Sequence, residues 1–513
     1  MKIGFRQMTA ALDRHYAIWI VIGLVGAIWL RRAASAGLWL DETVSFYTSQ
    51  GGTAETIRRA AHYHFQWPFY YLLLSALIQS GFSSEFALRL PSLIPTAVSA
   101  IYTFRIAHLL YDREGGWLAA LIFVTLDGSI FCAVSARPYG LSLMLTTISV
   151  WTLLRLAHSP SISTGLYYVL STLLAIYIMP FCAGILLVHF ALALTHLRKK
   201  SSNFTRDYLV CSLLVLLATI PCLPGYLNLP HSSSIFEVVG RPHSYRLALA
   251  LVPLAVPTMV LISFLYVRGL GFGLLSPRSL LASLVFGDKA WVAIWHILPP
   301  VGLFTLAWIC NSSNWYSERY FVWHTPALAL ILGGVIRSFE PLRARQALCS
   351  ILLVFLLIAE PYRPIFTEDW RSAISFLRTR LPAGDRSFLF YSGLVESAHP
   401  RMLESAADRE YLSAPLTYYK IDATPILLPY RLDQAEQEEY WQRTIEPILT
   451  QRDNVYVLGT DIITIGGRPI SSLLQSRLGQ SGYDMQELTF FKKTWVMRAH
   501  RAAAPELQKE DPG

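Results

Sequence analysis

Two adjacent acids, Asp41 and Glu42, stand in the segment Gly37–Phe46, which follows an apolar run near the start of the chain. A carboxylate held close to an alcohol can act as a general base, which typically contributes about 10²–10⁴-fold in rate. Trp39 precedes the pair, and tryptophan is enriched where a membrane meets water. Ionisable groups at that depth are costly and tend to be functional. The structural alternative is that the pair begins a helix, whose dipole favours negative charge in the first turn.

One such base suffices for an inverting displacement at a sugar carbon if the sugar is carried on a lipid phosphate, which is already a good leaving group. The reaction then requires cations that stabilise the departing phosphate. Arginines can also snorkel at the end of a span or rest on anionic lipid, which is the structural alternative for each. The arginines predicted on the same side of the membrane as the acids are Arg58, Arg59, Arg89, Arg137 and Arg319.

The composition indicates a membrane protein. Of 513 residues, 53% are hydrophobic and only 15% are charged, and the mean hydropathy is +0.41, which is unlike a soluble globular protein. The net charge of +9 is interpreted as basic loops that fix topology, not as a nucleic-acid surface. Since about 20 helical residues cross the hydrocarbon core, we predict about eleven spans, over residues 15–34, 86–110, 117–135, 140–157, 165–180, 181–197, 208–225, 247–267, 291–309, 320–336 and 347–360.

Basic residues in three loops predict the orientation of these spans. They are Arg198-Lys199-Lys200 with Arg206, Arg268 with Arg278 and Lys289, and Arg337 with Arg343 and Arg345. With these loops in the cytoplasm, the N-terminus is inside, while the first loop, about 36–85, and everything after Glu360 are outside. The short apolar run Trp67–Ile78 is predicted to be an interfacial helix and not a span.

The expected fold is therefore mainly α, a polytopic membrane protein with juxtamembrane helices in the first outer loop and a small C-terminal α/β domain. Its domains are residues 1–360, in the membrane, and 361–513, soluble on the outer side, with a frayed tail from about 502. In the second domain the patterns predict helices at Trp370–Leu377 and from about Ile470. They predict strands at Ser387–Tyr391, Asn454–Leu458 and Leu488–Met497.

Neither a metal nor a cofactor is expected. The six cysteines lie in or beside apolar segments without metal-ligand spacing, so a disulfide framework is not expected either. His62 and His64 form a His-x-His pair, but two ligands without a third are a weak zinc signal, and interfacial histidines are the preferred interpretation.

The segment Leu38–Thr43 resembles the first-loop acidic signature of polytopic GT-C glycosyltransferases of the bacterial protein-mannosyltransferase-like kind. That group includes enzymes that add aminoarabinose to lipid A and sugars to lipopolysaccharide cores. Two features depart from the family pattern: Trp67 replaces the first proline of a proline pair, and the loop has no obvious lysine. Further segments that resemble the family, in its order, are His64–Leu74, Glu85–Ser92, Ser135–Tyr139, Glu318–Phe321 and Asp369–Arg371.

This resemblance implies an inverting glycosyltransferase of the bacterial inner membrane. Its donor would be a polyprenyl-phosphate-linked sugar and its acceptor a hydroxyl on the periplasmic face, with no nucleic-acid partner. Asp41 would be the base or the acid that positions the acceptor, and Glu42 its structural or electrostatic partner. A transporter or flippase of lipid-linked glycans, or a polymerase, is the alternative, although few ionisable residues occur near mid-span. The residues predicted to contact the donor phosphate or other parts of the substrate are Arg137, Arg319, Arg89, Arg59, Gln66 and Tyr139.

Overall fold

The computed structural model describes most of the chain as two compact units. Its described residues are 23, 26–64, 67–197, 202–222, 240–252, 287–339, 345–351, 354, 366–382, 387–431, 435–465 and 467–502. We call Met1–Ala36 with Ser49–Pro364 the helical unit, and Gly37–Thr48 with Ile365–Gly513 the sheet unit. The acidic segment near the start of the chain thus groups with the C-terminal part, more than 300 residues away in sequence.

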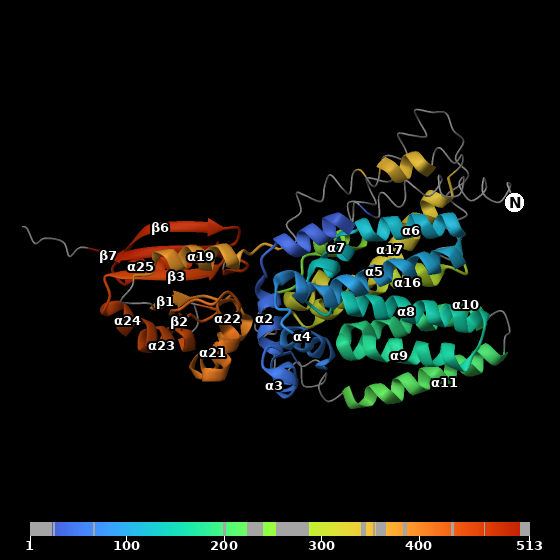
Figure 1. Ribbon diagram of the computed structural model, residues 1–513, viewed down its shortest axis with the longest axis horizontal. Coiled ribbons are helices and arrows are strands. Elements are labelled where there is room, and N and C mark those ends of the chain that lie inside the picture. The colour runs from blue at the N-terminus through green and yellow to red at the C-terminus, as the bar shows by residue number, and fades with distance from the viewer. Residues whose placement is uncertain are drawn as a thin grey trace, which may run out of the picture. The chain divides into compact units, whose positions relative to one another are not determined.

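The helical unit is built from packed α-helices. In Figure 1, α5, α8 and α9 run as neighbouring rods, and α11 packs on α9. Besides the helical residues 26–35, the described helices of this unit include α3 (Gly52–Arg59), α4 (Phe69–Gln79), α5 (Glu85–Leu110), α6 (Arg113–Thr125), α7 (Asp127–Val134), α8 (Tyr139–His158), α9 (Ile162–Ile178), α10 (Ile185–Leu197), α11 (Ser202–Thr219), α13 (Ser244–Leu251), α16 (Ala290–Ile309) and α17 (Thr325–Arg337).

Several of these helices can cross a membrane by length and composition. Among the described residues, α5, α8 and α16 are long and apolar enough, and α6 with α7, bent by 62°, forms a further candidate. The unit therefore has the make-up of a multi-pass membrane protein, while the number of eleven spans stays a prediction. The predicted spans 15–34, 208–225, 247–267 and 347–360 lie partly or largely outside the described residues.

The apolar run after Trp67 forms the short helix α4, of 11 residues. At 1.5 Å per residue this helix is about 17 Å long, well short of the roughly 30 Å of a hydrocarbon core. Its length agrees with the prediction that this segment does not cross the membrane. Together with α3 and a π-helical turn at Ala60–His64, it makes up a largely helical first loop.

Arg89 on α5 is fully buried and holds the end of the first helix. Its Nη1 donates to the carbonyl oxygens of Ala33 (2.8 Å) and Ala36 (2.7 Å), where the helix formed by residues 26–35 ends. A cation is favourable at a helix C-terminus, where the last carbonyls have no partner within the helix. These bonds give Arg89 a structural role at the point where the chain enters the acidic segment.

We expect Arg89→Met to destabilise the protein by roughly 2–4 kcal/mol, because one buried and one part-buried carbonyl lose a charged donor. Thermal unfolding in detergent measures this loss, with Arg105→Met on the exposed side of the same helix as the control. A variant with native melting temperature and a raised KM for the donor would instead support the predicted role of Arg89 in substrate binding.

The sheet unit contains a five-stranded mixed sheet of order β2-β1-β3-β7-β6. Strand β1 (Ser387–Phe390) pairs in parallel with β2 (Thr424–Leu427) and β3 (Asn454–Thr460). Strand β7 (Thr494–Arg501) pairs antiparallel with β3 and with β6 (Tyr483–Phe491). Helices α19 (Trp370–Arg380) and α25 (Ile470–Gln480) lie against this sheet (Figure 1).

The predicted helices and two of the predicted strands in this unit are confirmed, but the single strand predicted at Leu488–Met497 is wrong. The structure has a hairpin there, with β6 and β7 joined at Lys492 and Lys493. The turn contains no glycine, proline or asparagine, and Lys492 takes a φ of 58° that lysine seldom adopts. Apolar residues continue on both sides of the turn, so the sequence pattern shows no interruption.

Candidate functional site

The two adjacent acids lie at the start of helix α2 (Leu40–Ser49), where they have different environments. Glu42 is fully buried, and its Oε2 accepts the backbone N–H of Trp39 at 3.2 Å. This is the reciprocal half of a capping box, in which the third helical residue reaches back to the N-cap. Asp41 is only half-buried. Glu42 therefore caps the helix, and Asp41 is the acid of the pair with the more accessible carboxyl.

Side chains of the C-terminal part also hold the backbone that leads into α2. The N–H of Leu38 donates to the hydroxyl of Tyr419 (2.7 Å), and the N–H of Leu40 donates to Oε2 of Glu368 (3.0 Å). The Trp39 ring stacks on Phe366, with centroids 5.7 Å apart and planes 18° apart. Three consecutive backbone donors, those of residues 38, 39 and 40, are thus bound by side chains.

Glu368 is a third carboxyl beside the acidic pair, and only 3% of its surface is exposed. Burial raises the pKa of Glu368 to about 8, and the negative charges of Asp41 and Glu42 add to this effect. The hydrogen bond from the Leu40 N–H and the nearby Trp370 indole act in the opposite direction. Glu368 is therefore largely protonated at neutral pH.

Neither Glu368 nor Tyr419 was predicted from the sequence. The bond between Leu40 and Glu368 joins residues 328 positions apart, and no periodic pattern relates two such distant segments. The available signal was the position of Glu368 directly before the Asp369–Arg371 segment that resembles the family. In the structure, Asp369 caps α19 by accepting the Ser372 N–H (3.1 Å).

In the helical unit, Arg137 lies in the turn that leads into α8. The Ser92 hydroxyl donates to the Arg137 carbonyl oxygen (2.7 Å) and lies 2.9 Å from the Tyr70 hydroxyl of α4. A Cβ at Gly140 would stand 2.4 Å from the Ser92 carbonyl oxygen, so only glycine permits this approach of α8 to α5. The turn is thereby fixed to two helices, which restricts where the Arg137 side chain can reach.

Tyr139, which was predicted to contact substrate, and His64, which was interpreted as an interfacial histidine, lie near Arg137. Its guanidinium carbon is 5.8 Å from the centre of the Tyr139 ring. His64 stacks on Tyr71, with centroids 4.7 Å apart. Burial, and after it the positive charge of Arg137, holds the pKa of His64 well below 6.5. The imidazole of His64 is therefore neutral beside the positive charge of Arg137.

The other predicted cationic residues have contacts of their own. Arg319 lies 5.2 Å from the ring of Tyr320, which in turn packs 4.7 Å from Phe181. Arg59 pairs with Glu55 (2.6 Å), and hydrogen bonds from Arg58 above all lower the pKa of Glu55 to about 2. Gln66 lies outside the described residues.

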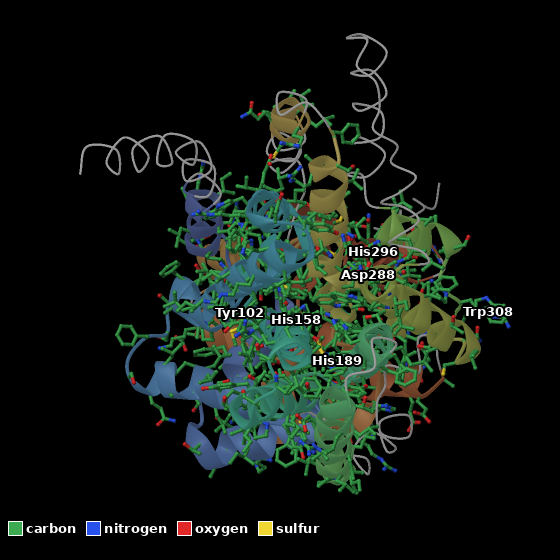
Figure 2. The ribbon with its side chains drawn as sticks, turned by 90° about the vertical axis from the view of Figure 1, so that its right-hand side faces the viewer. Tyr102, His158, His189, Asp288, His296 and Trp308 are labelled. Carbon is green, nitrogen blue, oxygen red and sulfur yellow. The ribbon has the colours of Figure 1, made fainter. Side chains whose placement is uncertain are left out.

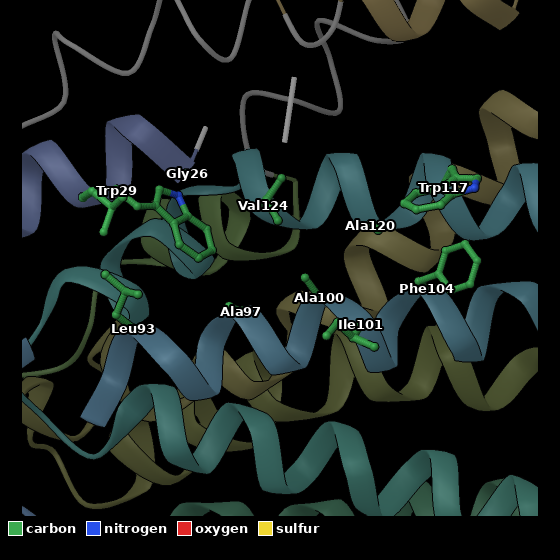
Figure 3. A pocket seen from close by; sticks show the side chains of 11 residues that line it. Gly26, Trp29, Leu93, Ala97, Ala100, Ile101, Phe104, Trp117, Ala120 and Val124 are labelled. Atoms are coloured by element: carbon green, nitrogen blue, oxygen red, sulfur yellow. The ribbon is translucent and has the colours of Figure 1, made fainter. Parts of the chain in front are cut away.

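Helix α5 also lines an apolar cavity of about 550 Å³ together with α6 and the first helix (Figure 3). Its described lining includes no charged side chain. The cavity thus suits a hydrocarbon chain, whereas a phosphate would have to be bound elsewhere. The residues that line it are Gly26, Trp29, Leu30, Leu93, Ala97, Ala100, Ile101, Phe104, Trp117, Ala120 and Val124.

The buried His189 of the helical unit forms hydrogen bonds with neighbouring side chains. Figure 2 shows His189 among the helices, whereas Trp308 points away from them. The Nδ1 and Nε2 of His189 lie 3.2 Å from the Tyr168 hydroxyl and 3.1 Å from the Ser149 hydroxyl. Because each of its ring nitrogens has a hydrogen-bond partner, His189 has a structural role. In the described part of the chain, no cluster of three or more His, Cys, Asp or Glu residues could hold a metal ion.

Comparison with known proteins identifies the fold. No protein-family model matches the chain, and no curated protein does. The chain is similar to the crystal structure of ArnT from Cupriavidus metallidurans in the apo state, with a TM-score of 0.54 and 10% identity over 95% of this chain and 98% of ArnT. For ArnT from the same organism bound to undecaprenyl phosphate, the TM-score is 0.52, with 10% identity over 94% of this chain and 98% of ArnT.

The chain therefore has the fold of ArnT, a glycosyltransferase of the GT-C superfamily, and is mainly helical with a small C-terminal sheet. The particular protein whose fold it shares, ArnT, is an aminoarabinose transferase. The fold that the acidic signature and the other segments implied is thus confirmed.

Proposed function

We propose that this protein is an inverting glycosyltransferase that moves a sugar from a polyprenyl-phosphate-linked donor to a hydroxyl acceptor on the periplasmic face of the bacterial inner membrane. The observation that carries the proposal is the division of roles between Asp41 and Glu42, in a chain with the fold of ArnT. Glu42 is buried and caps the helix, whereas Asp41 has the more accessible carboxyl of the two. One ArnT structure is bound to undecaprenyl phosphate, a carrier of the proposed donor class.

In the proposed reaction, Asp41 accepts the proton of the acceptor hydroxyl while that oxygen attacks the anomeric carbon. The bond between this carbon and the phosphate oxygen breaks, and polyprenyl phosphate leaves with the electron pair of that bond. Asp41 lies in the first turn of α2, where the helix dipole favours its ionised form. A single displacement of this kind inverts the configuration at the anomeric carbon.

The departing phosphate requires positive charge. We assign it first to Arg137, because the bond from Ser92 and the close packing at Gly140 fix its turn before substrate arrives. Arg319, supported by Tyr320, is the second candidate. Arg89 and Arg59 hold two carbonyls and Glu55 respectively, which gives each a structural role. Their contacts with substrate, and those of Gln66 and Tyr139, stay predictions.

The apolar cavity beside α5 supports a lipid-linked donor, because burying each methylene of a prenyl chain stabilises binding by about 0.8 kcal/mol.

Reconstitution of the purified protein into liposomes tests the proposal. The liposomes contain a panel of polyprenyl-phosphate sugars, and an envelope extract supplies the acceptors. We expect polyprenyl phosphate to be released as the sugar appears on an acceptor, in equal amounts by mass spectrometry. Movement of intact donor across the bilayer without release of polyprenyl phosphate would instead identify a flippase and contradict the proposal.

A further inference from the structure

We propose that Glu368 is a positioning residue that fixes the start of helix α2, and with it the Asp41 carboxyl. This inference rests on the proposed function for its catalytic consequence. Its structural part, the protonated anchor, concerns the sheet unit alone.

The geometry makes Glu368 the direct support of the residue before Asp41. Its Oε2 accepts the N–H of Leu40, the first residue of α2, at 3.0 Å. An N–H in the first turn of a helix has no partner within the helix, so this acceptor determines where the first turn is held. A displacement of about 1 Å at a reacting group can cost about 10²-fold in rate.

Glu368 is itself held on a rigid part of the unit. Its backbone forms an isolated bridge with Lys492, in the turn of the hairpin between β6 and β7. On either side, the Lys493 N–H donates to the Thr367 carbonyl (2.8 Å), and the Asp369 N–H donates to the Thr494 hydroxyl (3.2 Å). The carboxyl therefore connects the hairpin to the acidic segment.

The charges around this carboxyl explain why the proton matters. Asp41 and Glu42 face it from α2, and the Trp370 indole faces it from α19. The nearest lysine of the hairpin, Lys492, directs its Nζ to the Phe366 carbonyl (3.4 Å). An ionised Glu368 would be a third negative charge in a buried place, and the cost of burying that charge would destabilise the folded sheet unit.

The direction of the pH effect follows from the raised pKa. The folded protein holds a proton on Glu368 up to about pH 8, whereas an exposed glutamate in the unfolded chain loses it near 4.5. The stabilising contribution is therefore complete below pH 4.5, declines as the pH rises, and is lost once the pH has passed about 8. A glutamine at this position has no proton to lose.

The first test compares Glu368→Gln with the native protein by thermal unfolding in detergent between pH 5 and 9. We expect the melting temperature of the variant minus that of the native protein to increase with pH up to about 8 and then to stay constant. The control, Glu439→Gln on an exposed position of the same unit, should give a difference that does not follow this course. A constant difference for Glu368→Gln would overturn the role of the proton, whether or not the protein transfers sugar.

The second test separates positioning from bulk stability. Glu368→Leu removes the acceptor of the Leu40 N–H, so hydrogen exchange in the peptide that spans residues 37–44 should accelerate at pH 7. The rate of transfer, kcat, should fall about 10²-fold with little change in the KM for the donor. Glu368→Gln, which retains a carbonyl acceptor, should restore both readouts and keep its activity above pH 8, where the native enzyme declines.

Native exchange in Glu368→Leu would overturn the positioning role. If no form of the protein transfers sugar, the proposed function fails, while the melting and exchange data still decide whether Glu368 anchors the helix.

Discussion

Asp41→Asn should lower the kcat of sugar transfer by about 10²–10⁴-fold, the typical contribution of a general base. Asparagine has nearly the shape of aspartate but cannot take a proton from the acceptor hydroxyl. Because Asp41 is half-buried and Glu42 caps the helix, the fold should persist. The stability cost should be at most about 1 kcal/mol, from the lost interaction with the helix dipole. Initial rates in liposomes with saturating donor measure the effect.

The matched control for this variant is Glu439→Gln, another conversion of a carboxylate to an amide in the same unit. It should retain native rates. A native rate in Asp41→Asn, with normal insertion into the membrane, would remove Asp41 from the chemistry and leave it as a residue of the helix N-terminus.

Arg137→Ala should lower kcat/KM for the donor by about 10²-fold, because a fixed donor to the developing phosphate charge typically contributes 10²–10³-fold. The Ser92 hydroxyl binds the backbone carbonyl of residue 137, so the turn keeps this support when the side chain is removed. Arg137→Lys should recover only part of the loss, since an ammonium cannot offer the paired N–H groups of a guanidinium. Rates measured over a range of donor concentrations separate the two parameters.

Arg155→Ala, at the exposed far end of helix α8, whose start follows Arg137, is the control and should behave like the native protein. Unchanged turnover of Arg137→Ala at every donor concentration would show that Arg137 only anchors a helix end, the alternative for any arginine that ends a span.

Local patterns predicted much of the fold. Apolar runs of helical length gave α5, α8 and α16, and alternating residues gave β1 and β3, because hydrophobic periodicity reflects which face is buried. The hairpin at Lys492 was missed because its turn has none of the residues that usually mark one. The grouping of Gly37–Thr48 with the C-terminal unit could not be predicted, since it depends on contacts between segments hundreds of residues apart.

The candidate site, too, could be predicted from the sequence only in part. The acids were found because two carboxylates beside a tryptophan are unusual after an apolar run, and the arginines because the proposed chemistry needs cations. The division of roles between Asp41 and Glu42 required coordinates, since it depends on one hydrogen bond to the Trp39 N–H. The same is true of Arg89, whose bonds to Ala33 and Ala36 give it a structural role.

The anomeric configuration of the transferred sugar tests the central claim most directly. A single displacement driven by Asp41 requires the product to have the configuration opposite to that of the donor, with one polyprenyl phosphate released for each sugar transferred. Magnetic resonance spectra of donor and product, taken from the reconstituted enzyme, give both configurations. Inversion is the result predicted here. Retention would require a second displacement through a covalent intermediate and would contradict a mechanism in which Asp41 acts as a base.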